Sequence, residues 1–150
     1  MKTVKLQAAT PYLAAFVIFY KDGKIACVLR ENTGWNDGNY CLPSGKVEEN
    51  ESAMAAAIRE AKEEAGIDLK SANLKPALVV HRNSPDSDWI DVLFEAVDWE
   101  GEPYNAEPHI HKELAWLDVH NLPENMVPAV RFYTEQFLAG NHYAELGWEE

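Results

Sequence analysis

A helix-forming segment lies between strand-forming segments, and this order constrains the fold more than any other feature of the sequence. Residues 52–65 are rich in Ala and Glu and are followed by Gly66, a residue that commonly ends a helix. The apolar side chains of this segment recur at intervals of four, three and four residues; they are Met54, Ile58, Ala61 and Ala65. This spacing predicts a helix with one buried stripe, which needs another apolar layer to pack against.

Strand-forming segments supply that layer. Residues 13–20 and 24–30 are rich in strand formers, and the Asp22-Gly23 pair between them predicts a hairpin. The further expected elements are an exposed loop at 31–40, a turn at 42–45, strands at 75–81, 89–97 and 114–117, and a last helix at 124–139, opened by Leu122-Pro123 and closed by Gly140. The chain shows no internal repeat or linker, so we expect one domain over residues 1–150, an α/β/α sandwich with a mixed central sheet.

The charge balance limits the classes of partner. The chain carries 13 Lys and Arg against 25 Asp and Glu, a formal net charge of −12. Binding to a nucleic-acid polymer depends on clustered Lys and Arg, so we expect no such partner. An acidic chain can hold a phosphate-bearing ligand only through cations, backbone N–H groups or local basic side chains.

The N-terminal residues and the cysteines favour a cytoplasmic protein. Residues 1–5 lead into a mixed polar sequence without the apolar core of a signal peptide. No apolar run approaches the length that spans a membrane, so we expect no membrane partner. Cys27 and Cys41 lie in apolar surroundings, where we expect reduced core thiols.

Three carboxylates gather on one face of the predicted helix. At about 100° per residue, Glu60, Glu63 and Glu64 fall within about 100° of one another, opposite the apolar stripe, so we expect them at the surface. Like charges at this spacing repel one another. A divalent cation such as Mg²⁺ prefers oxygen ligands and would offset the repulsion; the alternative is a solvated acidic face without a ligand.

The spacing around this face is more specific than the acidic cluster alone. Gly45 is followed after five residues by Glu51, and after seven more by Arg59-Glu60-Ala61-Lys62-Glu63-Glu64-Ala65-Gly66-Ile67. This stretch resembles the signature of the Nudix hydrolase family, G-x5-E-x7-R-E-U-x-E-E-x-G-U with U aliphatic, at every fixed position. Such a match arises by chance on the order of 10⁻⁸ times per starting position. It covers residues 45–67, and Ala61 is small for an aliphatic position.

The resemblance implies a loop–helix–loop catalytic element that cuts a diphosphate linkage with Mg²⁺, for which Mn²⁺ can substitute. Glu60 and Glu64 are then the first metal ligands, and Glu63 completes the set directly or through water. Arg59 is expected to hold the Glu63 carboxylate by a forked hydrogen bond. Glu51 is expected to order the junction between the loop and the helix.

Two residues before the helix complete the implied site for metal and substrate. Gly45 is expected to let the backbone approach the metal or a phosphate, where a side chain would crowd. The family often has a second glycine just before this one, and its carbonyl oxygen binds metal. Ser44 stands at that position here, so its carbonyl is a candidate metal ligand.

The general base has two candidates. One is Glu60; the other, from outside the signature, is Glu113, because relatives have a glutamate that reaches the metal site a few residues before a Trp at this point of the chain. His109 and His111 alternate at two-residue spacing, which suggests a metal pair. Imidazole suits Mg²⁺ poorly, however, so we expect both histidines at the surface.

The substrate is expected to be a small-molecule nucleotide. A nucleobase needs an aromatic platform and one or two polar groups, for which the candidates are Trp35, Tyr40, Trp89, Trp116 and Asn125. Residues 118–123 resemble the region that shapes the base pocket in MutT-like members, which favours a nucleoside or deoxynucleoside triphosphate, a damaged one included, cut to the monophosphate and pyrophosphate. ADP-ribose or another nucleotide conjugate stays open as the substrate. A Nudix-fold sensor without turnover and a homodimer also stay open.

Overall fold

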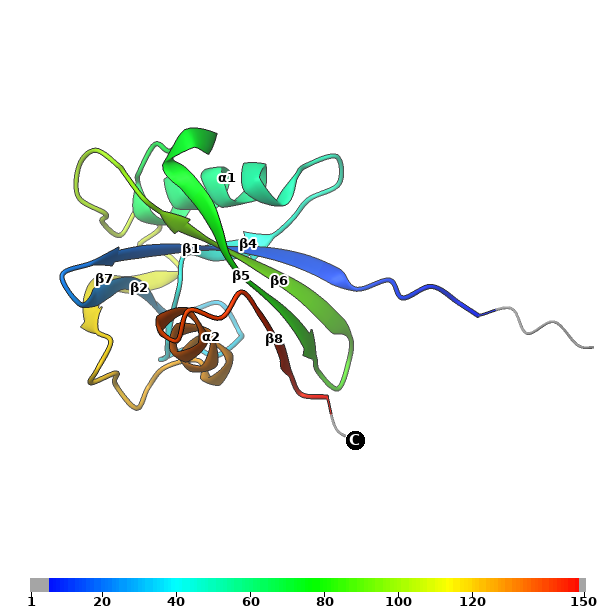
Figure 1. Cartoon of the computed structure of the whole chain (residues 1–150). Coiled ribbons are helices and arrows are strands. Elements are labelled where there is room, and N and C mark those ends of the chain that lie inside the picture. Colours follow the sequence, from blue (N-terminus) through cyan, green and yellow to red (C-terminus); the bar gives the residue numbers. More distant parts are fainter. Residues whose placement is uncertain (1–5, 149–150) are drawn as a thin grey trace, which may run out of the picture.

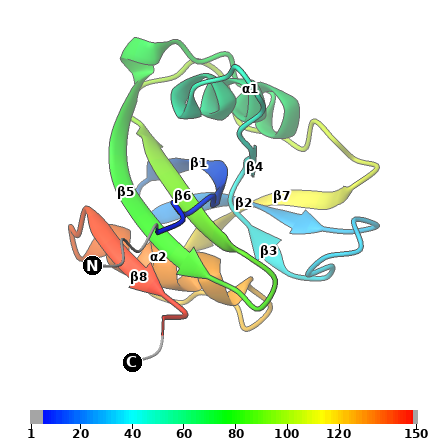
Figure 2. The same ribbon diagram turned by 90° about the vertical axis from the view of Figure 1, so that its right-hand side faces the viewer.

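The computed structural model describes residues 6–148, so the expectation for residues 1–5 lies outside the described residues. The elements in chain order are β1 (Tyr12–Lys21), β2 (Lys24–Arg30), β3 (Tyr40–Cys41), β4 (Ser44–Lys46), α1 (Ala53–Ala65), the 3₁₀ turn η1 (Ser71–Asn73), β5 (Leu74–Asn83), β6 (Asp88–Ala96), β7 (His111–Asp118), α2 (Pro128–Leu138) and β8 (Tyr143–Leu146). Figures 1 and 2 show the strands as a central layer with α1 on one face and α2 on the other. The predicted α/β/α sandwich is confirmed.

The central sheet is mixed, as predicted. Its strands follow the order β3-β2-β1-β6-β5-β8, with β4 paired to β1 and β7 paired to β2. β1 runs parallel to β6, and β5 runs parallel to β8. The pairs β1–β2, β2–β7 and β5–β6 are antiparallel. The chain therefore combines local hairpins with longer crossovers in one sheet.

The predicted hairpin between β1 and β2 is confirmed. Asp22 and Gly23 form its turn with φ values of 52° and 76°. Both values lie in the left-handed region, which a two-residue hairpin turn requires and which Asp-Gly adopts readily. β1 and β2 pair through only two residue pairs next to this turn, Tyr20 with Ile25 and Lys21 with Lys24.

Beyond these pairs the sheet opens into two arms. β1 continues along β4 and β6, whereas β2 continues along β3 and β7. The chain between β3 and β4 crosses from one arm to the other, and there the Val17 N–H donates to the Pro43 carbonyl at 2.9 Å. Leu42 and Pro43 are buried in this crossing. The end of the sheet opposite the hairpin is therefore split, with a backbone segment at its centre.

Helix α1 forms within the predicted segment and ends before Gly66, as predicted. The Ser52 side chain accepts a hydrogen bond from the Ala55 N–H at 3.0 Å, and Gly66 ends the helix with a φ of 69°. The side chains that α1 buries completely are those of Ala56, Ala57, Ala61 and Ala65. Met54 and Ile58 of the predicted stripe lie half-buried at its margin. Small side chains along the buried face let α1 lie close to the sheet.

Helix α2 begins later than predicted, because its expected first turn pairs with a strand instead. The Tyr40 N–H donates to the Asn125 carbonyl at 2.9 Å, and the Val127 N–H donates to the Tyr40 carbonyl at 3.0 Å. Helical geometry starts only at Pro128, a residue suited to the first helical position because it lacks the N–H that would stay unbonded there. Leu122-Pro123 therefore does not open the helix.

The short strands β3, β4 and β8 were not predicted, and β1, β5 and β7 extend beyond their predicted bounds. β3 and β4 contain two and three residues, and β4 begins within the expected turn at 42–45. β8 has four residues at the edge of the sheet, and β7 starts at His111, ahead of the expected 114. Segments this short carry too few residues for a period of two to be recognised.

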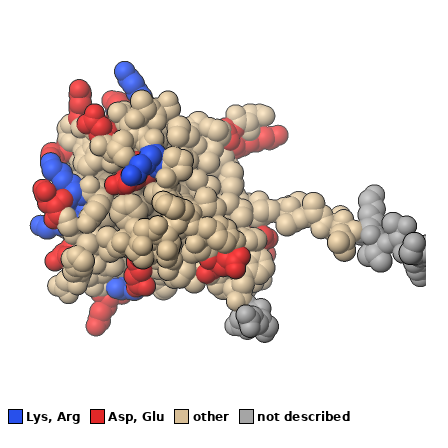
Figure 3. Space-filling view, viewed as in Figure 1, with Lys and Arg blue, Asp and Glu red and all other residues tan. Residues whose placement is uncertain are grey.

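The two cysteines lie in the core, as predicted. Cys27 and Cys41 are both buried and unpaired. On the face drawn in Figure 3, Lys and Arg side chains stand among acidic ones and do not gather into one patch. Among residues 6–148, the structure contains no helix with the length and apolar character needed to cross a membrane.

Candidate active site

A hollow of about 1020 Å³ opens where the two arms of the sheet part. β1 lines it with Phe16, β2 with Arg30, and β4 with residues 44–46. β5 and β6 contribute Arg82 and Trp89, and α1 contributes its carboxylates. The hollow is therefore lined partly by the segment that resembles the family signature and partly by strands outside that segment.

Glu60 and Glu64 of α1 line this hollow. The prediction that both lie at the protein surface is wrong. Their relative exposures are 8% and 6%. The helical spacing places them on one side of α1, and β4 with the start of β7 then covers that side. The third carboxylate, Glu63, keeps 48% of its side chain exposed. The helical wheel identified the shared face correctly, but it contains no information on what lies over that face.

Gly45 is needed because the backbone of β4 passes directly over Glu60. A Cβ atom at position 45 would lie 2.1 Å from Glu60 Oε1 and 2.4 Å from Glu60 Cδ. Neither distance is tolerable between non-bonded atoms. Close approach therefore explains this glycine, and its neighbour is a carboxylate that the resemblance assigns to metal.

Ser44 contacts the same cluster through its backbone. Its N–H donates to Glu64 Oε2 at 2.8 Å, which fixes that carboxylate. Its hydroxyl lies 3.8 Å from Cys41 Sγ. The side chain therefore points away from the carboxylates, and the backbone of residue 44 lies beside them.

Arg59 makes its fork with Glu51, so the predicted fork with Glu63 is wrong. Arg59 Nε and Nη2 donate to the two Glu51 oxygens at 2.8 and 3.0 Å. Arg59 Nη1 donates to Glu60 Oε1 at 2.6 Å and reaches Glu63 Oε2 at 3.3 Å. The loop before α1 returns Glu51 to the helix face, a contact that helical spacing alone does not reveal. Hydrogen bonds from Arg59 lower the pKa of Glu51 to about 2.

The buried carboxylates carry a high electrostatic cost. Burial raises the pKa of Glu60 to about 7, although the Arg59 guanidinium opposes the rise. Burial also raises the pKa of Glu64 well above its ordinary value, against the opposing hydrogen bond from the Ser44 N–H. The surroundings of these two groups therefore favour their neutral forms unless a positive charge enters the hollow.

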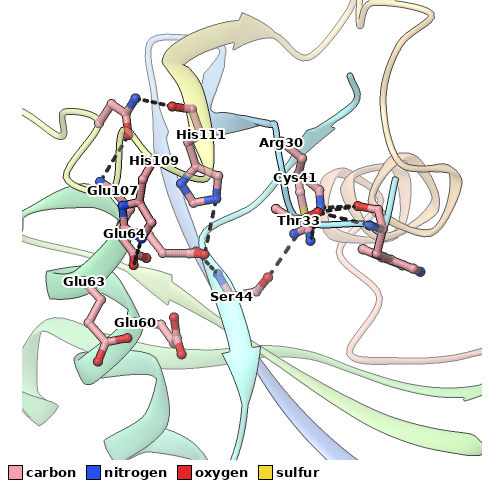
Figure 4. A network of polar contacts seen from close by, with 12 residues as sticks. Arg30, Thr33, Cys41, Ser44, Glu60, Glu63, Glu64, Glu107, His109 and His111 are labelled. Carbon is pink, nitrogen blue, oxygen red and sulfur yellow. Dashed lines mark hydrogen bonds and ion pairs between the residues drawn. The ribbon is translucent and has the colours of Figure 1, made fainter. Parts of the chain in front are cut away.

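Glu107 and His111 join the cluster, and the sequence interpretation missed both. One ligand atom each from Glu64, Glu107 and His111 lies within 4.8 Å of the others. His111 is 1% exposed, and its Nε2 lies 3.7 Å from Glu64 Oε1 (Figure 4). Within residues 6–148 neither ring nitrogen of His111 has a hydrogen-bond partner.

The prediction of two surface histidines is therefore half right. His109 is exposed, but His111 is buried beside Glu64. Burial and the nearby Arg30 lower the pKa of His111 to about 4, so its imidazole is neutral at pH 7 and keeps a lone pair free. The alternating histidines were the available sequence signal for this residue. Glu107 stands in a turn and carries no such signal.

Glu113 lies apart from the cluster. In the pairing of β7 with β2, Glu113 is opposite Leu29, whereas His111 is opposite Arg30, with a β-bulge between them. Consecutive residues of β2 point to opposite faces, so the bulge turns Glu113 to the face away from His111. Glu113 is exposed and does not line the hollow.

The family model of the NUDIX domain matches residues 10–137, most of the chain. This chain belongs to the Nudix hydrolase family. It is 36% identical over 118 residues to an ADP-ribose pyrophosphatase from Methanocaldococcus jannaschii, an alignment that covers 76% of this chain and 66% of that relative. It is 30% identical over 120 residues to Nudix hydrolase 10 from Arabidopsis thaliana, covering 65% of this chain and 43% of that relative. The chain thus spans less than two thirds of these relatives' lengths.

Solved structures show the same fold. The chain superposes on a MutT NUDIX hydrolase from Burkholderia pseudomallei with a TM-score of 0.75 and 29% identity, covering 85% of this chain and 98% of that one. The solution structure of the E. coli ORF135 protein gives a TM-score of 0.72 at 24% identity, with coverage of 91% and 94%. The second likeness supports the fold alone.

The donor set of this Nudix site fits a divalent cation. Oxygens of Glu60, Glu63, Glu64 and Glu107 and a nitrogen of His111 line one hollow. Carboxylate oxygens are ligands for Mg²⁺ and Mn²⁺, and an imidazole nitrogen suits Mn²⁺ better than Mg²⁺. The raised pKa values and the unbonded imidazole are what such a group would relieve.

The predicted aromatic and polar substrate residues are divided between the hollow and other places. Trp35 is 53% exposed and lines the hollow, with the Arg30 guanidinium 4.8 Å from its ring centroid. Trp116 does not line it and packs beneath α1, with its ring 6.5 Å from that of Trp99. Asn125 lines a smaller, neighbouring hollow and donates to the Gly38 carbonyl at 3.2 Å. Trp89 lines the main hollow.

Proposed function

We propose that this chain, as one Nudix domain, is a Mg²⁺-dependent pyrophosphohydrolase that cuts the diphosphate linkage of a nucleotide. Its substrate is a nucleoside triphosphate, which it converts to the monophosphate and pyrophosphate. One observation carries the proposal: buried Glu60 and Glu64, with Glu107 and His111 beside them, line a hollow that is also large enough for a nucleotide.

The metal is proposed to bind Glu60, Glu63, Glu64 and Glu107, with the Ser44 carbonyl as a backbone ligand. When bound, Mg²⁺ or Mn²⁺ supplies positive charge for the phosphate oxygens and lowers the pKa of a bound water. The protein's own contribution is to hold the carboxylates before the ligand arrives. The Ser44 N–H positions Glu64, and the contact between Gly45 and Glu60 positions the second carboxylate.

Glu60 is proposed as the general base. Arg59 Nη1 donates to Glu60 Oε1, which leaves Oε2 free to take the proton of the attacking water. A carboxylate in this position accepts the proton of a water whose own pKa a bound cation would lower. Glu51 holds Arg59 through the fork, so it acts as a positioning residue two contacts away from the water.

Arg30 is proposed to bind phosphate oxygens beside the carboxylates. It lines the hollow, where its Nε donates to the Trp35 carbonyl at 2.7 Å and its Nη2 to Thr33 Oγ1 at 2.9 Å. Those bonds fix the guanidinium and leave Nη1 for a ligand. Trp35 extends the same wall and is proposed to cover the substrate. Asn125, beside the neighbouring hollow, is a weaker candidate for the same role.

A second candidate substrate is ADP-ribose, because the 36% identical relative is named an ADP-ribose pyrophosphatase. The two substrates give different products. A nucleoside triphosphate would give pyrophosphate, whereas ADP-ribose cut at its diphosphate would give AMP and ribose 5-phosphate. Pyrophosphate release therefore separates the candidates directly.

The test is a substrate panel with Mg²⁺ and with excess EDTA, scored separately for pyrophosphate, inorganic phosphate and monophosphate. We expect pyrophosphate from triphosphates with Mg²⁺ and none with EDTA. Glu60→Gln should lower the rate by about 100-fold or more. Glu113→Gln is the matched control, because Glu113 is an exposed carboxylate outside the hollow. Binding of nucleotides without turnover of any substrate would instead identify a sensor and overturn the proposal.

A further inference from the structure

A buried ion pair holds Arg82 against the wall of the hollow. Asp91 on β6 is 0% exposed and accepts hydrogen bonds from Arg82 Nε at 2.7 Å and from Arg82 Nη2 at 3.3 Å. Tyr133 on α2 is 1% exposed; its hydroxyl accepts from Arg82 Nε at 3.0 Å and donates to Asp91 Oδ2. Three elements, β5, β6 and α2, thus fix one guanidinium.

This arrangement is costly if its purpose is stability alone. Taking a carboxylate and a guanidinium out of water is unfavourable, and the mutual attraction of such a pair often fails to exceed that cost. Arg82 keeps 19% of its side chain exposed and lines the hollow that holds the metal-site carboxylates. A binding group that packing and hydrogen bonds lock in place is what selective recognition requires.

The hydrogen bonds of Arg82 determine which of its donors remain for a ligand. A guanidinium carries five N–H groups, and Asp91 uses the one on Nε and one on Nη2. Nη1 makes no hydrogen bond to any of residues 6–148, so Nη1 and the second hydrogen of Nη2 form a free fork at the end of the side chain. Asp91 neutralises the charge, so this fork suits two neutral acceptors better than a phosphate.

The surrounding wall suits the flat face of a base. Phe16 and Trp89 line the hollow together with Arg82, and the Arg82 guanidinium carbon lies 5.1 Å from the Trp89 ring centroid. Aromatic side chains with a few fixed polar groups are the usual lining of sites for planar ligands. The metal-site carboxylates lie in the same hollow, so a nucleotide there would place its phosphates and its base against different groups.

We infer that Arg82 selects the base of the substrate by donating its free fork to two adjacent acceptors. Guanine offers O6 and N7, and cytosine offers O2 and N3. Adenine presents an amino group beside N7, and uracil presents an N–H between its two carbonyls, so each sets a donor against the fork. The inference rests on the proposed function and narrows its substrate to guanine or cytosine nucleotides.

The experiment measures binding of GMP, CMP, AMP and UMP by calorimetry in EDTA, where turnover plays no part. GMP, CMP or both should bind about 10-fold to 100-fold more tightly than AMP and UMP, the discrimination typical of a bidentate contact to a base. If GMP binds best, 7-deaza-GMP, which lacks the N7 acceptor, should lose most of that advantage. Equal affinity for all four monophosphates overturns the inference.

Variants locate the effect. Arg82→Lys removes the fork and should abolish the preference among bases, while Lys75→Gln is the control because Lys75 lies on the same strand with an exposed side chain. If Arg82→Lys fails to fold, the wild-type series with 7-deaza-GMP decides. If Arg82→Lys instead weakens pyrophosphate binding and leaves the base preference intact, Arg82 binds phosphate and the inference is overturned. Turnover of all four triphosphates at equal kcat/KM overturns the inference about Arg82 but supports the proposed hydrolysis. Preferential binding of one base without turnover of any triphosphate supports the inference and overturns the proposed hydrolysis.

Discussion

Glu60→Gln isolates the electrostatic cost of burying a carboxylate in the unliganded protein. The pKa of Glu60 is about 7 in the folded chain, against 4.5 for an ordinary glutamate, and this gap corresponds to about 3 kcal/mol. Below pH 4.5 the group is protonated in both states and costs nothing. As the pH rises from 4.5 to 7 the unfolded chain ionises first, so the folded chain loses stability across this window. Glutamine cannot ionise and escapes that loss.

The assay is urea denaturation at pH 4.5 and pH 8 with EDTA throughout. The free energy of unfolding of the wild type should fall between these pH values by about 3 kcal/mol more than that of Glu60→Gln. Glu113→Gln serves as the control and should follow the wild type, since its carboxylate is exposed. Added Mg²⁺ should stabilise the wild type at pH 8 and do little for Glu60→Gln. Parallel pH profiles for the wild type and Glu60→Gln would refute the reasoning.

Four further substitutions test the geometry. Gly45→Ala sets a Cβ 2.1 Å from Glu60 Oε1 and should lower both the melting temperature and, by about 100-fold, kcat; a normal kcat would contradict the assignment of this contact. Glu64→Gln should reduce turnover by about 100-fold with the fold retained, as circular dichroism would show. Glu113→Gln should leave kcat and KM unchanged in steady-state assays from pH 6 to 9. Trp116→Ala should cost about 3 kcal/mol in urea denaturation with KM unaffected, and a selective rise in KM would place this ring in the substrate site after all.

Local signals predicted the parts of the fold that depend on local interactions. Asp22-Gly23 predicted the hairpin because both residues tolerate positive φ. Gly66 predicted the end of α1 because a glycine readily adopts the left-handed conformation that ends a helix. Helical spacing placed Glu60 and Glu64 on one face. Each of these relationships spans only a few residues.

The missing parts depend on contacts between distant segments. The burial of Glu60 follows from β4 passing over α1, and Arg59 pairs with Glu51 because the loop bends back. A β-bulge near the start of β7 turns His111 toward the carboxylates and Glu113 away from them, and alternation along the sequence assigns both to the same face. Glu107 lies in a turn between β6 and β7, where no period marks it.

The hydrogen bonds among Asp91, Arg82 and Tyr133 also could not be predicted from the sequence. No local pattern marks Arg82 in the sequence, although a strand carries it and a helix from the far end of the chain anchors it. A buried Asp in a strand and a buried Tyr in a helix are each compatible with an ordinary core. Their hydrogen bonds to one guanidinium appear only in three dimensions.

The segment between β3 and β4 couples the stability of the fold to the geometry of the candidate active site. Leu42 and Pro43 seal the gap between the two arms of the sheet, and the next two residues hold the carboxylates of α1. Random mutagenesis should therefore find few neutral replacements at positions 42–45. Replacements at 42 and 43 would disturb core packing, and the resulting shift of residues 44 and 45 would displace the carboxylates of α1. Engineers who seek a more heat-resistant form would do better at the opposite edge, around β8, where the chain meets neither the crossing nor the hollow.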